Sequence, residues 1–259
     1  MGASMAWLTD DEIAFYRTEG YLVLQALFSS AEVAARADDV ERVGRERRDL
    51  IDANNMRVRF QAHTQTGEAL MEVFDPIADL SPTASKVAND RRILDRLHDL
   101  YGEPACLFKE KLIWKPPRAI GATLHQDWIS WPNFPKSFLT VLLAIDPFDD
   151  VSGATQVYPR IHTQGYLSSE DGQHHTLEDR KFPVEPVMLD LAPGDVAIFS
   201  CFTPHSSKPN HSARSRRGYF LSYNAQSDGG DQYVKHYAEF HDWIRTKYPP
   251  EKAQILYFR

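Results

Sequence analysis

Hydrophobic positions in the first hundred residues recur mainly with the spacing of a helix. Thr9 and Glu12 form the sequence pattern of a capping box, and Gly20 marks the end of a short first helix. The clearest helix begins at Ser81 and ends at Gly102. We therefore predict helices over residues 9–20, 29–51 and 81–102, a strand at 21–24, and an irregular polar segment over 50–80 with a short strand near 57–62.

From residue 105 onward the pattern changes to short apolar runs separated by Gly, Pro and Asp, such as "ACLFKEKLIW", "ATLHQDW" and "RGYFLSYNA". Many short strands with such breaks predict a β-sandwich or barrel. The long polar loop 161–183 is typical of segments that carry function. We expect one α+β domain over residues 1–259, mainly β, with an N-terminal helical part (about 9–102), a β core (about 105–225) and a C-terminal aromatic-rich helix (about 229–247).

The composition fits a globular protein, with 42% hydrophobic and 25% charged residues. A formal net charge of -7 argues against a sequence-independent nucleic-acid binder, which needs a basic surface. Two cysteines, Cys106 and Cys201, cannot form a disulfide framework and are expected to be buried thiols. Neither a signal-peptide pattern nor a membrane-spanning apolar stretch is evident. We therefore expect a cytoplasmic protein without nucleic-acid or membrane partners.

The segment "HQDW" at 125–128 is the strongest candidate for chemistry. In a strand, residues i and i+2 share a face, so His125 and Asp127 would aim at one point. They would supply two legs of a 2-His-1-carboxylate triad, the arrangement that suits non-haem Fe(II). His205 is the leading third ligand because it follows a predicted strand and precedes a turn. Such a pair alone is weak evidence among ten histidines. We expect five of the others to pack or face solvent, namely His98, His174, His175, His236 and His241.

Longer stretches around these residues resemble a known family. "LIWKPP" before "LHQDW", together with "GDVAIFSCFTPHSSKPNHSARSR", resembles the phytanoyl-CoA dioxygenase family of Fe(II)- and 2-oxoglutarate-dependent oxygenases. Between them, "SGATQVYPRIH" resembles the family segment "NGxLxVxPGSH", with Arg160 and Ile161 in place of Gly-Ser. The resemblance extends from about Thr9 to Tyr223. It implies a double-stranded β-helix (jelly roll, cupin-like) core flanked by helices, with Fe(II), 2-oxoglutarate as cosubstrate, and O2.

The resemblance also implies roles for individual residues. His125, Asp127 and His205 would hold the iron. The family places an arginine 11 residues after the distal histidine, which is Arg216 here; its planar fork suits the distal carboxylate of 2-oxoglutarate. A slip to Arg214 or Arg217 remains open, although strand alternation puts Arg216 and Arg217 on opposite faces. Further cosubstrate candidates are Ser207, which shares the inward parity of His205, Trp131, for which core packing is an equal alternative, and Lys109.

The substrate is indicated only by charge. Lys109, Lys111, Ile113 and Lys115 share one face of a predicted strand; solvent exposure is the default, and a barrel mouth that faces an anion is the functional interpretation. Related halogenases carry a small residue in place of the carboxylate ligand; because Asp127 is present, the resemblance implies hydroxylation of an aliphatic C–H and not halogenation. We hypothesise a small anionic or zwitterionic substrate, specifically an aminoalkylphosphonate such as 2-aminoethylphosphonate, which some family members hydroxylate. The substrate-contact candidates are Lys111, Arg57, Arg59, Arg160 and Gln126.

Other functions are compatible with parts of this pattern. One alternative is a non-catalytic sensor that binds 2-oxoglutarate or metal; another is an acyl-CoA hydroxylase of the same family. The latter would need an apolar tunnel, which the polar segment 50–66 does not obviously supply. A nucleic-acid demethylase with the same triad is disfavoured by the net charge, and a zinc-dependent β-barrel isomerase would not need Arg216. A monomer or homodimer is expected.

Overall fold

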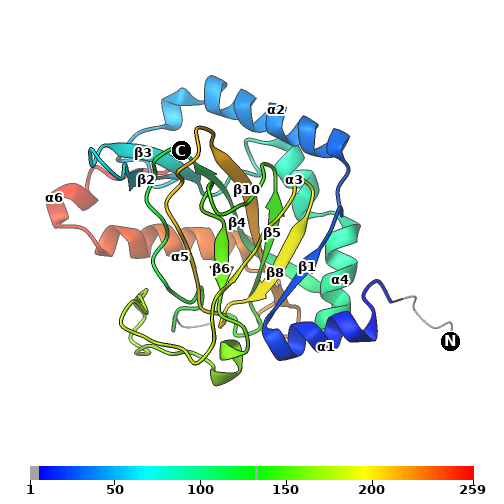
Figure 1. Cartoon of the computed structure of the whole chain (residues 1–259). Helices are drawn as coiled ribbons and strands as arrows, with labels where there is room; N and C mark the ends of the chain where they lie inside the picture. Colours follow the sequence, from blue (N-terminus) through cyan, green and yellow to red (C-terminus); the bar gives the residue numbers. More distant parts are fainter. Residues whose placement is uncertain (1–5, 132–133) are drawn as a thin grey trace.

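Two antiparallel sheets form the centre of the protein, seen in a computed structural model that describes residues 6–131 and 134–259 (Figure 1). The large sheet has the strand order β1-β8-β5-β10-β4-β3-β2 and the small sheet the order β7-β6-β9. The strands of the large sheet, in that order, are Tyr21–Leu24, Val196–Ser200, Leu139–Ala144, Arg216–Ala225, Ala105–Lys115, Ala69–Phe74 and Val58–Ala62; those of the small sheet are Val187–Met188, Thr155–Val157 and His205–Ser207.

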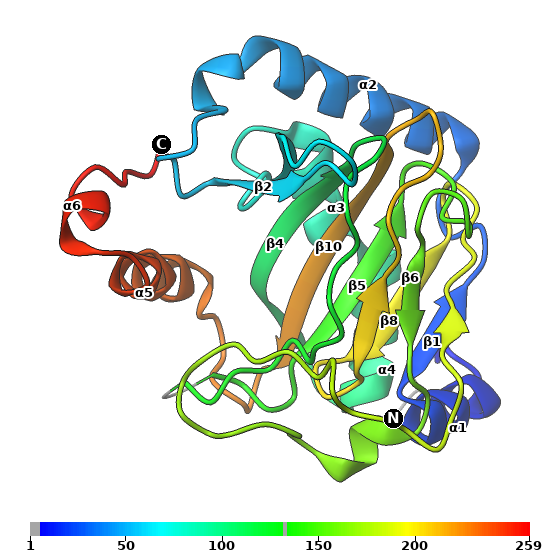
Figure 2. The same cartoon turned by 60° about the vertical axis from the view of Figure 1, so that its left-hand side comes forward.

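Helices cover the face of the large sheet that points away from the small sheet (Figure 2). They begin and end as follows: α1 Asp10–Glu19, α2 Ser30–Glu46, α3 Pro82–Ala88, α4 Arg91–Tyr101, α5 Tyr233–Thr246 and α6 Pro250–Ala253, with short 3-10 helices η1 Arg48–Leu50 and η2 Ile161–Gln164. Of these, α2, α3 and α4 lie against the covered face, whereas α5 packs near β4. No helix within residues 6–131 and 134–259 is long and apolar enough to cross a membrane.

The pleat of the strands separates two hydrophobic cores. On β5, Val141 and Leu143 belong to the core under the helices, whereas Leu142 and Ala144 belong to the core between the sheets. This β5 segment is apolar on both faces because each face is buried, which explains its uninterrupted hydrophobic run. The same alternation governs β10 and decides which arginine points between the sheets.

The helix ends agree with the sequence in part. Thr9 and Glu12 form the predicted capping box, and Gly20 ends α1 in a left-handed conformation with φ 81°. The single helix predicted over 81–102 is wrong, because α3 ends at Ala88 and a separate helix, α4, begins at Arg91. Asp90 is the cause: its side chain accepts a hydrogen bond from the Arg92 amide at 2.9 Å and caps the second helix.

The N-terminal part is less purely helical than predicted. The segment before residue 105 supplies β1 at one edge of the large sheet and the hairpin β2–β3 at the other. The strand predicted near 57–62 is confirmed as β2, but its partner β3 was not anticipated within the irregular segment 50–80. The run "ATLHQDW" is not a regular strand either, since His125 makes only isolated bridges, to Thr176 and His205.

Helix α5 is fixed to the large sheet through a buried hydroxyl. Tyr237 Oη lies 2.8 Å from Asp75 Oδ1, 2.7 Å from the carbonyl oxygen of Glu110, and 3.1 Å from the Glu110 amide. Asp75 is buried and also accepts a hydrogen bond from Arg59 at 2.7 Å. Loss of the hydroxyl would leave two buried residues short of a partner, namely Asp75, which follows β3, and Glu110 of β4.

We therefore expect Tyr237→Phe to lower the free energy of unfolding by about 1–3 kcal/mol, the cost of leaving a buried polar group unsatisfied. Urea unfolding followed by circular dichroism would measure it. The control is Tyr248→Phe, because Tyr248 is 46% exposed and its change should be small. Equal effects of the two substitutions would contradict this account of how α5 is held.

Candidate active site

Backbone pairing brings the two candidate histidine ligands together. The His125 amide donates to the His205 carbonyl at 3.0 Å, and the His205 amide donates back to His125 at 2.9 Å. The two residues are thus direct cross-strand neighbours, and their ring centroids lie 4.3 Å apart. On the other side of His125, the Leu177 amide donates to the Leu124 carbonyl at 2.7 Å and ties the long loop to this segment. The small sheet therefore continues through the site as irregular backbone.

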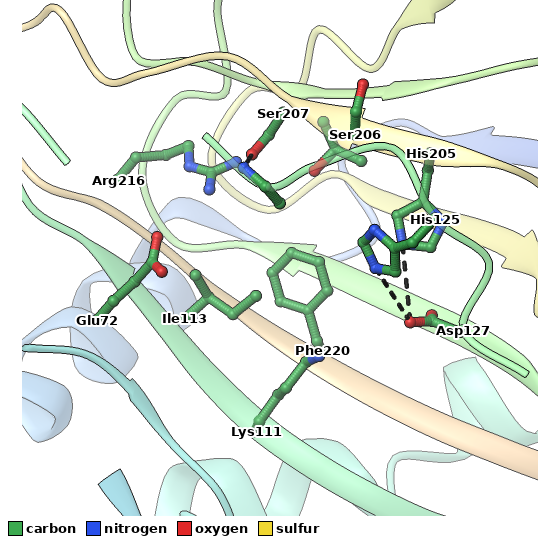
Figure 3. Close-up of a pocket in the computed structure, with 12 residues that line it drawn as sticks. Glu72, Lys111, Ile113, His125, Asp127, His205, Ser206, Ser207, Arg216 and Phe220 are labelled. Atoms are coloured by element: carbon green, nitrogen blue, oxygen red, sulfur yellow. Dashed lines mark hydrogen bonds and ion pairs between the residues drawn. The ribbon is translucent and has the colours of Figure 1, made fainter. Parts of the chain in front are cut away.

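Both rings point toward one carboxylate (Figure 3). Asp127 Oδ1 lies 3.8 Å from His125 Nε2 and 3.7 Å from His205 Nε2, and the candidate ligand atoms of the three residues all lie within 4.8 Å of one another. Around a divalent metal with bonds of about 2.1 Å, neighbouring ligand atoms stand about 3 Å apart. A contraction of less than an ångström would bring Asp127 Oδ1 to that distance from each ring. The donor set fits a metal ion.

Hydrogen bonds behind the rings hold them in the form that a metal requires. His125 Nδ1 lies 2.7 Å from the Thr123 carbonyl, and His205 Nδ1 lies 3.0 Å from the Thr203 carbonyl. Each Nδ1–H is therefore the donor, and each Nε2 lone pair faces Asp127. Burial, followed by the nearby charge of His205, lowers the pKa of His125 to about 3, so that its ring is neutral.

The carboxylate is held as well. Thr140 Oγ1 donates to Asp127 Oδ2 at 2.8 Å, which leaves Oδ1 facing the two rings. Burial raises the pKa of Asp127, but the neighbouring charges of His205 and Lys111 outweigh burial and keep that pKa below its ordinary value. Asp127 is thus ionised, as a metal ligand must be.

The three residues open into a small cavity of about 120 Å³. Figure 3 shows Arg216 on the opposite side of this cavity from Asp127. Nine of its twelve lining residues are polar or charged, and its apolar lining residues are Ile113, Ala122 and Phe220. The remaining lining residues are Glu72, Lys111, His125, Asp127, Thr155, His205, Ser206, Ser207 and Arg216.

Arg216 is a buried cation without a hydrogen-bond partner on two of its nitrogens. Its exposed fraction is 2%, and Nε and Nη1 have no partner within the described part of the chain. The guanidinium carbon lies 4.3 Å from the centre of the Phe148 ring. Burial lowers its pKa only to about 10, so the group remains charged at neutral pH. A buried guanidinium with free donors is suited to bind an anion from the cavity.

The neighbouring arginines point elsewhere, and the predicted opposition of Arg216 and Arg217 is confirmed. Arg216 shares the face of Phe220, between the sheets, whereas Arg217 makes two side-chain bonds to Asp146, at 2.7 and 2.8 Å, and one to Glu41. Arg214 pairs with exposed Asp149 at 2.8 Å. Neither Arg214 nor Arg217 lines the cavity.

The lysine face of β4 points inward, against the default of solvent exposure. Lys111 and Ile113 line the cavity, and Lys109 is half-buried with its Nζ 5.5 Å from the Phe138 ring centre. Lys115 is fully buried; its Nζ lies 3.0 Å from Ser207 Oγ and also contacts the carbonyls of Gly153 and Lys208. Ser207 thus lines the cavity as expected and receives a bond from Lys115.

Two residues predicted to contact ligands have packing roles. Trp131 lies outside the cavity lining; its ring packs at 4.9 Å from that of Trp243, and its Nε1 donates to the Gly172 carbonyl at 2.9 Å. The core-packing alternative therefore describes Trp131. The Gln126 amide bonds the backbone at Gly165, Leu167 and Phe202, so it fastens the long loop and does not face the cavity.

Two of the three arginines expected near substrate are engaged outside the cavity. Arg57 is buried against Asp79, which its nitrogens contact at 2.7 and 2.8 Å, and it lies over the Phe258 ring. Arg160, in a left-handed conformation with φ 68°, pairs with Glu19 at 3.3 Å. The expected contacts of Arg57 and Arg160 with substrate are therefore wrong, because both side chains are paired with carboxylates outside the cavity. Arg59 pairs with Asp75 and stays within electrostatic reach of Lys111.

Some residues near the cavity were not anticipated. Glu72, within the apolar strand run "ALMEVF", lines the cavity, and its isolated charge was a signal that could have drawn attention. His174, expected only to face solvent, is exposed but has its ring centroid 5.2 Å from that of His125. Thr140, which holds Asp127, carries no sequence signal, because its role depends on a contact between separate segments.

Comparison with known proteins places the chain among oxygenases. The model of the phytanoyl-CoA dioxygenase family (PhyH) matches residues 16–218. The 2-aminoethylphosphonate dioxygenase of Uncultured bacterium HF130_AEPn_1 is 27% identical over 254 residues, or 97% of this chain and 93% of the relative. The methylphosphonate hydroxylase of Gimesia maris is 29% identical over 236 residues, or 90% of this chain and 86% of the relative.

A solved structure shares the fold. EctD from S. alaskensis, crystallised with 2-oxoglutarate and 5-hydroxyectoine, superposes with a TM-score of 0.72 and 23% identity, over 88% of this chain and 80% of that one. This likeness and the paired antiparallel sheets confirm the expected α+β fold with a double-stranded β-helix core.

If Thr140 holds Asp127 for a metal, Thr140→Val should weaken metal binding by about 10- to 100-fold, the usual effect of removing an outer hydrogen bond to a ligand. Titration of the metal-free protein with Co(II), followed by its visible absorption, would measure the affinity. Thr163→Val is the control, because Thr163 is exposed and its hydroxyl bonds only the Arg160 carbonyl. Unchanged affinity in Thr140→Val would contradict this role.

Proposed function

As the chain belongs to the phytanoyl-CoA dioxygenase family and is a 2-oxoglutarate-dependent non-haem iron dioxygenase, we propose that it hydroxylates an aliphatic C–H of a small anionic or zwitterionic metabolite. The specific candidate is 2-aminoethylphosphonate. The proposal rests mainly on Lys111, a cation that lines the same cavity as the three candidate metal ligands.

We assign the metal to His125, Asp127 and His205. Bound there, Fe(II) would supply the activation of O2 that couples conversion of 2-oxoglutarate to succinate and CO2 with hydroxylation of the substrate. The protein's own part is geometric: the Nδ1 bonds of the two histidines and the Thr140 bond to Asp127 keep the ligand atoms convergent.

We assign the distal carboxylate of 2-oxoglutarate to Arg216. Its Nε and Nη1 are unpartnered, and an edge of the planar guanidinium can donate two parallel N–H bonds to the two oxygens of one carboxylate. The opposite placement of Arg216 and Asp127 across the cavity suits a molecule with an anionic group at one end and a metal-binding group at the other (Figure 3). Ser207 lines the cavity between these ends and supports Lys115.

The charges nearest the metal favour an anionic prime substrate. Burial, and then the neighbouring charge of Lys109, lower the pKa of Lys111 to about 8, which leaves it mainly cationic at neutral pH. Neither lysine has a carboxylate within ion-pair distance in the part of the chain that the structure describes. Asp75, buried nearby, is already bonded by Arg59. A bound phosphonate or carboxylate would give these cations a partner.

The two relatives named above support the phosphonate class, since their names identify 2-aminoethylphosphonate and methylphosphonate as what they act on. A long acyl chain is a poorer match, because the cavity is lined mainly by charged and polar side chains. The sensor alternative is disfavoured by the presence of all three candidate ligands together with Arg216. A cytoplasmic location, the absence of a nucleic-acid partner, and a monomeric or homodimeric state remain predictions from the sequence.

A substrate panel tests the proposal. The protein is loaded anaerobically with Fe(II) and 2-oxoglutarate, exposed to O2, and supplied with aminophosphonates, amino acids, quaternary amines or acyl-CoA esters. We expect 2-aminoethylphosphonate or a close anionic analogue to give succinate and hydroxylated product in equal amounts, and Asp127→Ala to give neither. Lys111→Met should raise the KM for that substrate, by about 10-fold or more if a charge-assisted bond is lost.

The matched control is Lys235→Met, because Lys235 is an exposed lysine of α5 paired with Glu239. Coupled turnover that prefers a neutral or long-chain substrate would refute the proposed substrate class.

A further inference from the structure

Glu72 is the unexpected acidic residue of the cavity. It lies in β3 where the pairing with β2 shifts: Arg59 pairs with Val73 and Phe60 with Met71, so Glu72 is the extra residue of a β-bulge. Bulges redirect side chains and are common beside active sites. Figure 3 shows the Glu72 carboxylate within the cavity, on the same side as Arg216.

The carboxylate is buried without an ion pair. Only 8% of Glu72 is exposed, and no described lysine or arginine lies within ion-pair distance of it. Burial raises its pKa, and the nearby charges of Lys115 and Arg216 oppose that rise. The charges of Lys115 and Arg216 therefore act on Glu72 across the cavity, although neither side chain forms an ion pair with it.

The charges at this end of the cavity can be counted. Lys115 contacts three oxygen acceptors, which matches the three donors of an ammonium group, and Arg216 is charged. The two residues are direct partners across β4 and β10. Burial, and then the charge of Arg216, lower the pKa of Lys115 to about 7, and the charge of Glu72 opposes that fall. With Lys115 protonated, two positive charges and one negative charge leave a net charge of one, and a proton moved between Glu72 and Lys115 would not change that sum. One carboxylate neutralises it.

We propose that Glu72 determines which anion the cosubstrate end of the cavity accepts: it limits the net charge to one, so that the distal carboxylate of 2-oxoglutarate fits and a dianionic phosphate or phosphonate group is rejected. The proposal rests on the assignment of 2-oxoglutarate to Arg216. This selectivity would matter for an enzyme with a phosphonate substrate, because the phosphonate group could otherwise bind at Arg216 in place of 2-oxoglutarate. Specificity of this kind arises from repulsion of the wrong ligand.

The test measures binding without turnover. Protein loaded with Ni(II) is titrated with 2-oxoglutarate by calorimetry at pH 7, with and without inorganic phosphate as competitor. The repulsion between Glu72 and a bound anion is about twice as large for a dianionic phosphate as for a single carboxylate. Glu72→Gln removes this repulsion and should therefore strengthen phosphate competition more than 2-oxoglutarate binding. We expect the preference for 2-oxoglutarate over phosphate to fall by about 10-fold or more.

Three variants isolate the cause. Glu72→Asp keeps the charge and should retain the wild-type preference, as should Glu68→Gln, which alters an exposed glutamate of the same hairpin. In Glu72→Gln, a second substitution Arg216→Met should abolish phosphate competition, which places the phosphate at Arg216 and not on the metal. Thermal unfolding of each variant checks that the fold is kept.

The outcomes separate the two proposals. If Arg216→Met alone binds 2-oxoglutarate as tightly as the wild type, the proposed cosubstrate site is wrong and the role of Glu72 falls with it. If Arg216 is needed but Glu72→Gln keeps the wild-type preference, or Glu72→Asp loses it equally, the role of Glu72 alone is overturned.

Discussion

The reciprocal backbone pairing of His125 with His205 is the constraint on which the site depends. These two hydrogen bonds, at 3.0 and 2.9 Å, place ligands from distant parts of the chain side by side. The Asp127 amide is fixed in turn by the carbonyl of Cys201, the residue directly after β8, at 3.1 Å. Backbone geometry therefore positions the donor set, and the side-chain bonds to Thr123, Thr203 and Thr140 only orient what the backbone has brought together.

The cavity between the sheets has different electrostatics at its two ends. At the metal end, the neutral ring of His125 and the ionised carboxylate of Asp127 converge with the ring of His205, and Lys111 lies nearby. At the other end, Arg216 and Lys115 are buried beside Glu72. In a site shielded from water, charges act over longer distances than at the surface, so the arrangement can separate a metal-binding group from a distal carboxylate along one molecule. The proposed chemistry needs both ends, and the small volume keeps them close.

The parts of this account that were predictable from the sequence follow local rules. The alternation of side chains along a strand correctly put His125 and Asp127 on one face, and Arg216 and Arg217 on opposite faces. It held even in the irregular run "ATLHQDW", because a short extended stretch of backbone is enough for side chains to alternate. The parts that failed depend on distant contacts. The isolated charge of Glu72 is visible in the sequence, but the bulge that turns it into the cavity is not, and neither is the pairing of Arg57 with Asp79, since each is set by contact with another segment.

A crystal structure of the anaerobic complex with Fe(II) and 2-oxoglutarate tests the central claim most directly. We predict iron bound by His125 Nε2, Asp127 Oδ1 and His205 Nε2, with the distal carboxylate of 2-oxoglutarate on the guanidinium of Arg216. Iron bound by other residues, or a distal carboxylate held by Arg214 or Arg217, would contradict it.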